Sequence, residues 1–272
     1  MSFLDTLMSY QFLSQALLTA AIVGVVSGAV GCIIVLRNLS LMGDAMSHAV
    51  LPGVAISYLL GIPAFIGALI SGLLTSTLIS TLIEYSKTKR DAAIGITFTT
   101  FFSVGVIIIS MIQSTTSLYH MLFGSILTVT RHDFLMTAAV SLIVLIFIVI
   151  FYTPLKLTTF DPVFAEMNGL NPKFWQYVIM LMLALITVVS LQTVGIILVV
   201  AMLITPASAA YLITRSLHTM MFTAAAIGLI SAVSGIYFSF IFNVPSGAAI
   251  VICSCIIYAA IFTIQTFRRK II

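Results

Sequence analysis

A carboxylate and an imidazole, Asp44 and His48, are the side chains of this sequence best suited to chemistry. They lie four positions apart in the stretch 39–53, LSLMGDAMSHAVLPG, and this spacing puts both on one face of a helix. An ionised aspartate and a neutral imidazole are suitable ligands for a divalent transition metal. An ionisable residue inside a membrane segment costs about 2.5–3.5 kcal/mol on insertion scales, so by default it marks an ion or substrate path. The pair therefore predicts a metal site in a membrane protein.

The backbone around this pair leaves two interpretations open. Arg37 lies close by in sequence, and in the first interpretation both side chains sit near a helix end in headgroup water. Gly43 can break a helix, and irregular backbone at membrane depth is allowed where it lines a cavity. Pro52 removes a backbone hydrogen bond and bends a helix, so Pro52-Gly53 is either an ordinary kink or a hinge. We expect Gly43, Pro52 and Gly53 to act as hinge positions.

The composition sets the class of protein. The 272 residues are 61% hydrophobic and 7% charged, whereas soluble domains are about 25% charged. The chain must cross the membrane several times, and its net charge of +4 belongs to loops that fix orientation and is no sign of nucleic-acid binding. A cleavable signal is not expected, because Asp5 stands where a positive charge is needed and the first apolar run continues to Leu36.

Apolar runs long enough to span a bilayer predict an all-α polytopic membrane protein with about eight or nine transmembrane helices. The second and sixth runs are short and are candidates for broken or re-entrant helices. No internal repeat is evident, so one membrane domain covers 1–272. The runs are 12–36, 44–60, 63–84, 92–112, 133–153, 175–191, 193–213, 218–242 and 246–267.

Basic residues decide the orientation. With the N-terminus outside and nine crossings, only Arg131 of the eleven lysines and arginines falls outside, as the positive-inside rule requires. The C-terminus is then cytosolic. The ten residues predicted inside are Arg37, Lys87, Lys89, Arg90, Lys156, Lys173, Arg215, Arg268, Arg269 and Lys270.

The cytosolic connection at about 156–173 has the pattern of a short helix. Asp161 suits its N-cap, Pro162 its first position and Gly169 its C-cap. This piece is amphipathic and too short to span a membrane. We therefore expect it to dock on another protein.

Other polar residues carry weaker signals. His120 lies in the outer connection, where an incoming metal would arrive, and is a further candidate ligand, whereas His132 and His218 suit solvated loop positions. The glycines at 24, 28 and 31 form small-residue patterns that favour close helix packing. No Walker phosphate loop, zinc-protease helix or nucleophile elbow is present. Uphill transport would therefore need an ion gradient or a partner ATPase.

Several stretches together resemble the permease subunits of ATP-binding-cassette importers for manganese, zinc or iron. They are the motif at 39–55, Ala92–Ile96, Leu122–Leu127 and Ala201–Ala207. The resemblance covers nearly the whole chain and is greatest to manganese permeases of Gram-positive bacteria. It implies a single permease domain with no enzyme activity and no permanent cofactor. It also implies a homodimer in the plasma membrane, two cytosolic ATP-binding subunits and an extracellular metal-binding lipoprotein.

The resemblance also assigns roles to residues. Asp44 and His48 match the metal-contacting residues of the translocation path. The segment from Asp161 to Asn171 matches the coupling helix that docks on the ATPase. Its candidate contact residues are Asp161, Pro162, Phe164, Glu166, Gly169 and Leu170.

Two questions stay open at this point. Oxygen and nitrogen ligands fit manganese, iron and zinc, so manganese is favoured by resemblance alone. A proton-coupled secondary carrier, with the pair as a proton relay, is a rival mechanism. An intramembrane metalloenzyme is a weaker one, because it would need a third protein ligand and an open position.

Overall fold

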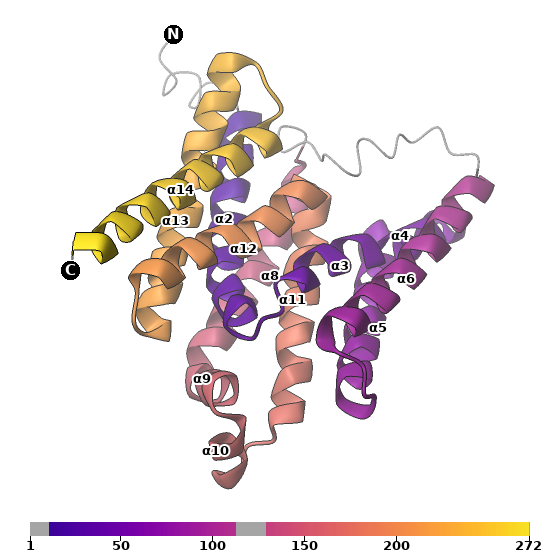
Figure 1. The fold of residues 1–272 in the computed structure, drawn as a ribbon. Coiled ribbons are helices and arrows are strands. Elements are labelled where there is room, and N and C mark those ends of the chain that lie inside the picture. Colours follow the sequence, from indigo (N-terminus) through magenta and orange to yellow (C-terminus); the bar gives the residue numbers. More distant parts are fainter. Residues whose placement is uncertain (1–10, 113–128, 272) are drawn as a thin grey trace.

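The chain folds into helices throughout the part that the structure describes (Figure 1). The structure is a computed structural model, and it describes residues 11–112 and 129–271. Every regular element in these two ranges is an α-helix, which confirms the predicted all-α fold. The helices are α2 (Gln11–Leu36), α3 (Leu41–Ala49), α4 (Leu51–Leu60), α5 (Ala64–Tyr85), α6 (Arg90–Ile112), α8 (Arg131–Ile150), α9 (Tyr152–Phe160), α10 (Pro162–Met167), α11 (Pro172–Val194), α12 (Ile196–Ile213), α13 (Leu217–Phe242) and α14 (Ser246–Ile271).

Eight of the helices in the described ranges are long and apolar enough to cross a bilayer. They correspond to eight of the nine predicted segments, and they include the sixth, which is the uninterrupted helix α11. The predicted second segment is different, because it consists of the two short helices α3 and α4. The eight long helices are α2, α5, α6, α8, α11, α12, α13 and α14.

The break in the second segment falls at Val50, between α3 and α4. Gly43 lies inside α3, where its backbone packs against the side chain of Leu203, so the expected break at Gly43 is absent. Pro52 is in the first turn of α4, where its missing N–H costs nothing. The Ser71 hydroxyl of α5 donates to the carbonyl of Ala49 at 2.7 Å and so satisfies an acceptor at the break.

The first long helix, α2, runs through the middle of the bundle and packs on α13 and α12 (Figure 1). A Cβ atom at Gly24 or Gly28 would lie 2.7 Å from a backbone carbonyl oxygen of α13, and one at Gly31 would collide with the carbonyl of Leu203 in α12. Such close backbone approach is what small-residue patterns permit. The prediction of packing glycines is confirmed.

The short helix α3 lies within the bundle, packed against α6, α12, α11 and α5. Most of its residues are buried, and Met42 and Met46 belong to the main apolar core. The methionines therefore fill space beside the predicted ligands. Four neighbouring helices fix the orientation of the helix that carries Asp44 and His48.

Candidate metal site and coupling segment

Asp44 and His48 lie together on the part of α3 that its neighbours leave open. The other positions of this helix from Met42 to Ala49 are buried, whereas the Asp44 side chain is 52% exposed and that of His48 is 21% exposed. The His48 Nε2 and Asp44 Oδ1 atoms are 3.6 Å apart. The helical spacing has brought one nitrogen and one oxygen ligand to a single point.

The separation of these two atoms suits a shared metal ion. With metal–ligand bonds of about 2.1 Å, two atoms 3.6 Å apart subtend an angle of about 118° at the ion. Within residues 11–112 and 129–271, no group of three or more His, Cys, Asp and Glu side chains is placed to hold a metal. The described part of one chain therefore offers two ligands of the four to six that such ions take.

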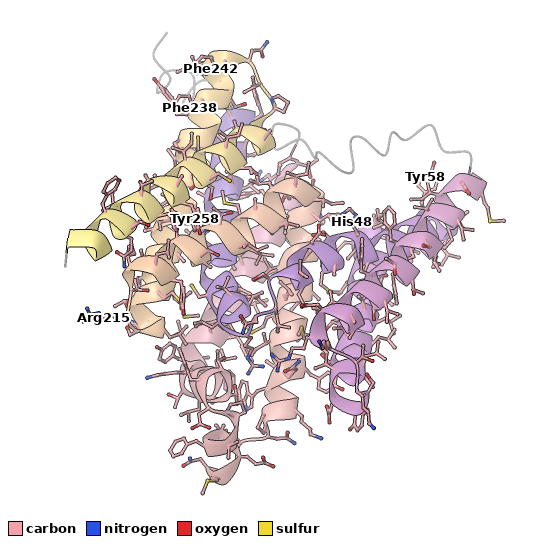
Figure 2. All side chains as sticks on the ribbon, in the orientation of Figure 1. His48, Tyr58, Arg215, Phe238, Phe242 and Tyr258 are labelled. Carbon is pink, nitrogen blue, oxygen red and sulfur yellow. The ribbon has the colours of Figure 1, made fainter. Side chains whose placement is uncertain are left out.

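The imidazole of His48, which is labelled in Figure 2, packs against two aromatic rings of α6. The ring centroids of Phe98 and Phe102 each lie 5.4 Å from that of His48, and Phe102 meets it edge to face. His48 Nδ1 is buried beside them with no hydrogen-bond partner in the described part of the chain. The Nε2 atom is thus left directed at Asp44. Neither phenylalanine was anticipated from the sequence, although both lie one helical turn apart on one face of a predicted span.

The expected hinge residues lie next to the site. Gly53 is in the first turn of α4 and faces Gly67 of α5 so closely that a Cβ on Gly53 would lie 2.0 Å from the Gly67 carbonyl oxygen. Pro52 and Gly53 are both buried. A hinge role for Gly43, Pro52 and Gly53 stays a prediction, because the structure presents a single conformation of them.

The segment 156–173 contains the end of α9 and the short helix α10, the lowest element in Figure 1. Asp161 caps α10 by accepting a hydrogen bond from the Phe164 amide at 2.9 Å, and Pro162 follows at the first position. Asn168 is the C-cap, so the predicted cap at Gly169 is wrong by one residue. Gly169 comes next with a left-handed φ of +78°, as a helix-terminating glycine does.

The apolar side chains of α10 point outward. Val163, Phe164 and Met167 are 69%, 51% and 82% exposed, and Glu166 is exposed beside them. Leu170 instead packs against the main core, and the amides of Gly169 and Leu170 close the helix by bonding the carbonyls of Glu166 and Ala165. A helix that is capped at both ends and apolar on its outer face fits a docking element.

The two other histidines in the described ranges do not reinforce the metal pair. His132 is an exposed residue in the first turn of α8. His218 packs its ring against Tyr152 and Phe222. His120 lies outside the described residues, so its proposed part in the site stays a prediction.

Comparison with known proteins gives matches over nearly the whole chain. Residues 9–265 match the family described as the ABC 3 transport family. The manganese transport system membrane protein MntC of Listeria monocytogenes is 52% identical over 262 residues, which are 96% of this chain and 94% of that protein. The manganese import system permease protein ScaB of Streptococcus parasanguinis is 47% identical over 268 residues, 98% of this chain and 96% of that protein.

A solved structure has the same fold. The structure described as PsaBC from Streptococcus pneumoniae in complex with Fab includes a chain that superposes with a TM-score of 0.87 and is 45% identical. The match covers 96% of this chain and 94% of that one. The likeness extends over the whole arrangement of helices around α3.

Proposed function

This chain belongs to the ABC 3 transport family, and on that premise we propose that it is the permease subunit of an importer that carries manganese into the cell. As a permease it is a transport subunit, and ATP hydrolysis belongs to a separate ATP-binding partner. The eight long apolar helices of the described ranges, together with the family match, support a multi-pass protein of the cell membrane. Relatives named for manganese transport support the choice of metal, and zinc or iron has less support.

One observation carries the proposed metal path: Asp44 Oδ1 and His48 Nε2 face each other at 3.6 Å on a helix whose other residues from Met42 to Ala49 are buried. A carboxylate cannot face lipid without a large cost, so water or protein must cover this face. A second copy related by a two-fold axis would bring two more ligands of the same kinds. Together, two carboxylates and two imidazoles would replace most of the hydration that the ion gives up.

The distribution of basic residues between the two ends of the molecule supports the proposed partners. The helix ends next to Arg37, Lys87, Lys89, Arg90 and Lys173 lie toward the lower end of Figure 1, where α10 also lies, whereas Arg131 begins α8 at the upper end. The positive-inside rule favours a cytosolic lower end. In this orientation the N-terminus is outside. The α10 helix of each chain would present Phe164 and its apolar neighbours to one of two ATP-binding subunits. A metal-binding lipoprotein would deliver manganese to the opposite end.

The test replaces Asp44 with Asn, which keeps the size of the side chain and removes its charge. In cells that depend on this importer, manganese uptake should fall by about tenfold or more, since even outer partners of a metal ligand are worth about 10- to 100-fold in affinity. Asp91→Asn makes the same chemical change at an exposed carboxylate in the first turn of α6 and should leave uptake unchanged. Immunoblots of the membrane and recovery of the assembled complex check that both variants are made equally.

Uptake by Asp44→Asn at the wild-type rate would rule out the proposed site. The same cells can be offered zinc and iron in place of manganese. If the wild-type importer takes up zinc or iron in preference to manganese, that metal becomes the proposed substrate. The family assignment would not change.

A further inference from the structure

Arg37 stands at the junction between α2 and the metal-bearing helix α3, and its side chain reaches elements far away in sequence. Its Nη2 donates to the carbonyl oxygen of Thr158 at 2.8 Å, and its Nε donates to Thr159 Oγ1 at 3.2 Å. Its Nη1 donates to Gln176 Oε1 of α11 at 3.3 Å. One guanidinium therefore joins the start of the α3 segment to the end of α9 and to α11.

The backbone of Arg37 is also held. Arg90, at the start of α6, donates from Nη1 to the Arg37 carbonyl oxygen at 3.1 Å. Asn38, the next residue, has a left-handed φ of +56°, a conformation that asparagine tolerates better than most residues. The turn between α2 and α3 is thus a tight connection, fixed at both its side chain and its main chain.

A cavity of about 310 Å³, lined by both apolar and charged side chains, adjoins these contacts. The charged groups on its walls besides Arg37 are Arg90, Glu84 and Lys173, and the last two form an ion pair. Burial, and secondarily the charge of Arg90, lower the pKa of Arg37 to about 10, so the guanidinium stays protonated at neutral pH. A charged hydrogen-bonding group next to open volume has room to exchange partners, which close packing would forbid.

The residues that accept hydrogen bonds from Arg37 at the end of α9 lie directly before α10 in the chain. Thr158 and Thr159 directly precede Phe160 and Asp161, and Asp161 caps α10. Any displacement of α10 that moves the end of α9 therefore acts on Arg37. Leu41 begins α3 only a few residues after Arg37, and Asp44 follows in its first turn.

We infer that Arg37 is a positioning residue that couples movement of the α9–α10 segment to the orientation of α3 and its metal ligands. This inference rests on the proposed function, because it requires an ATP-driven movement of α10. A conformational change is transmitted only if the contacts differ between the two states. The set of acceptors around the Arg37 guanidinium is the element that would differ.

The experiment uses the whole importer, reconstituted in lipid vesicles with its ATP-binding subunit and binding protein. Manganese uptake and ATP hydrolysis are measured in the same vesicles, and the readout is manganese moved per ATP hydrolysed. Arg37→Met should keep the rate of ATP hydrolysis within about twofold of the wild-type rate. The amount of manganese moved per ATP should fall by about fivefold or more, which is the lower end of typical coupling between sites. Arg37→Lys, which keeps a charge and one donor group, should recover part of the ratio.

The control and a second set of variants make the result decisive. Arg215→Met removes an arginine that is exposed, unlike the partly buried Arg37, and that is labelled in Figure 2; it should leave the ratio unchanged. Thr159→Val with Gln176→Leu removes two acceptors without touching the arginine, so this pair decides the matter if Arg37→Met fails to assemble. A wild-type ratio in the variants, or a parallel loss of both activities, overturns the inference. Wild-type vesicles that move no manganese with ATP would instead overturn the proposed function.

Discussion

The close contact between α4 and α5 yields a sharp quantitative prediction for Gly53→Ala. A Cβ atom at this position would lie 2.0 Å from the carbonyl oxygen of Gly67 and 2.6 Å from both its carbonyl carbon and Ser71 Cβ. Carbon atoms in good contact lie about 3.5–4.0 Å apart, so the two helices would have to separate by about 1 Å. Because the main obstacle is backbone, no side-chain rotation relieves it.

The expected cost follows from two opposing terms. Overpacking costs about 1–3 kcal/mol, and a backbone obstacle puts this site at the upper end. Replacing a helical glycine with alanine stabilises the helix by about 1 kcal/mol. We expect a net loss of about 2 kcal/mol, which corresponds to a fall in melting temperature of about 5 °C.

Thermal unfolding of the purified permease in detergent tests this prediction, with Gly95→Ala as the matched control. Gly95 lies inside α6, and an added Cβ there would have no atom within 4 Å, so this change should leave the melting temperature unchanged or raise it. A melting temperature of Gly53→Ala equal to that of the wild type would refute the predicted steric conflict with Gly67. A variant of normal stability that no longer transports manganese would instead favour the hinge role expected from the sequence.

Two further predictions concern the metal site and the coupling segment. Phe102→Leu removes one of the two rings beside His48, so the concentration of manganese at half-maximal uptake should rise while the maximal rate changes less; an unchanged half-maximal concentration would contradict the role given to this ring. Asp161→Ala removes the N-cap of α10 at a cost of about 1 kcal/mol and should reduce manganese transport per ATP, whereas Asp161→Asn keeps an acceptor oxygen and should reduce it less. Equal loss in the two variants would indicate that the carboxylate charge matters and the cap does not.

The features predicted correctly from the sequence depend on residues close together in the chain. Asp44 and His48 converge because they are one helical turn apart, and the N-cap at Asp161 follows from side-chain and backbone rules over three residues. The eight long helices were identified because each is a long apolar run between polar residues. Helical spacing, capping and apolar runs depend on residues close together in the chain or on composition, so they can be recognised in a single sequence.

The features that the sequence did not predict depend on partners far away in the chain. The break at Val50 was expected at Gly43, but Ser71 of α5 supplies a donor to Ala49 and Leu203 of α12 packs on Gly43. Glycine permits a break without requiring one, so its neighbours decide. The contacts of Arg37 with α9 and α11 are likewise invisible in sequence, where this residue served only as a positive charge near the membrane surface.

The charge of Asp44 connects the metal site to the assembly of the protein. Its side chain is half exposed in a single chain, although α3 packs against four other helices. A permanent charge in that position would be costly against lipid, and a buried charge needs a partner of opposite sign. The described part of this chain places no third His, Cys, Asp or Glu side chain with Asp44 and His48. Under the proposed function, a transported cation and whatever covers the open face of α3 would together provide that compensation. Dimer formation and metal binding should therefore depend on the same surface, and a change at Asp44 that removes its charge should weaken metal binding while making the empty site less costly to enclose.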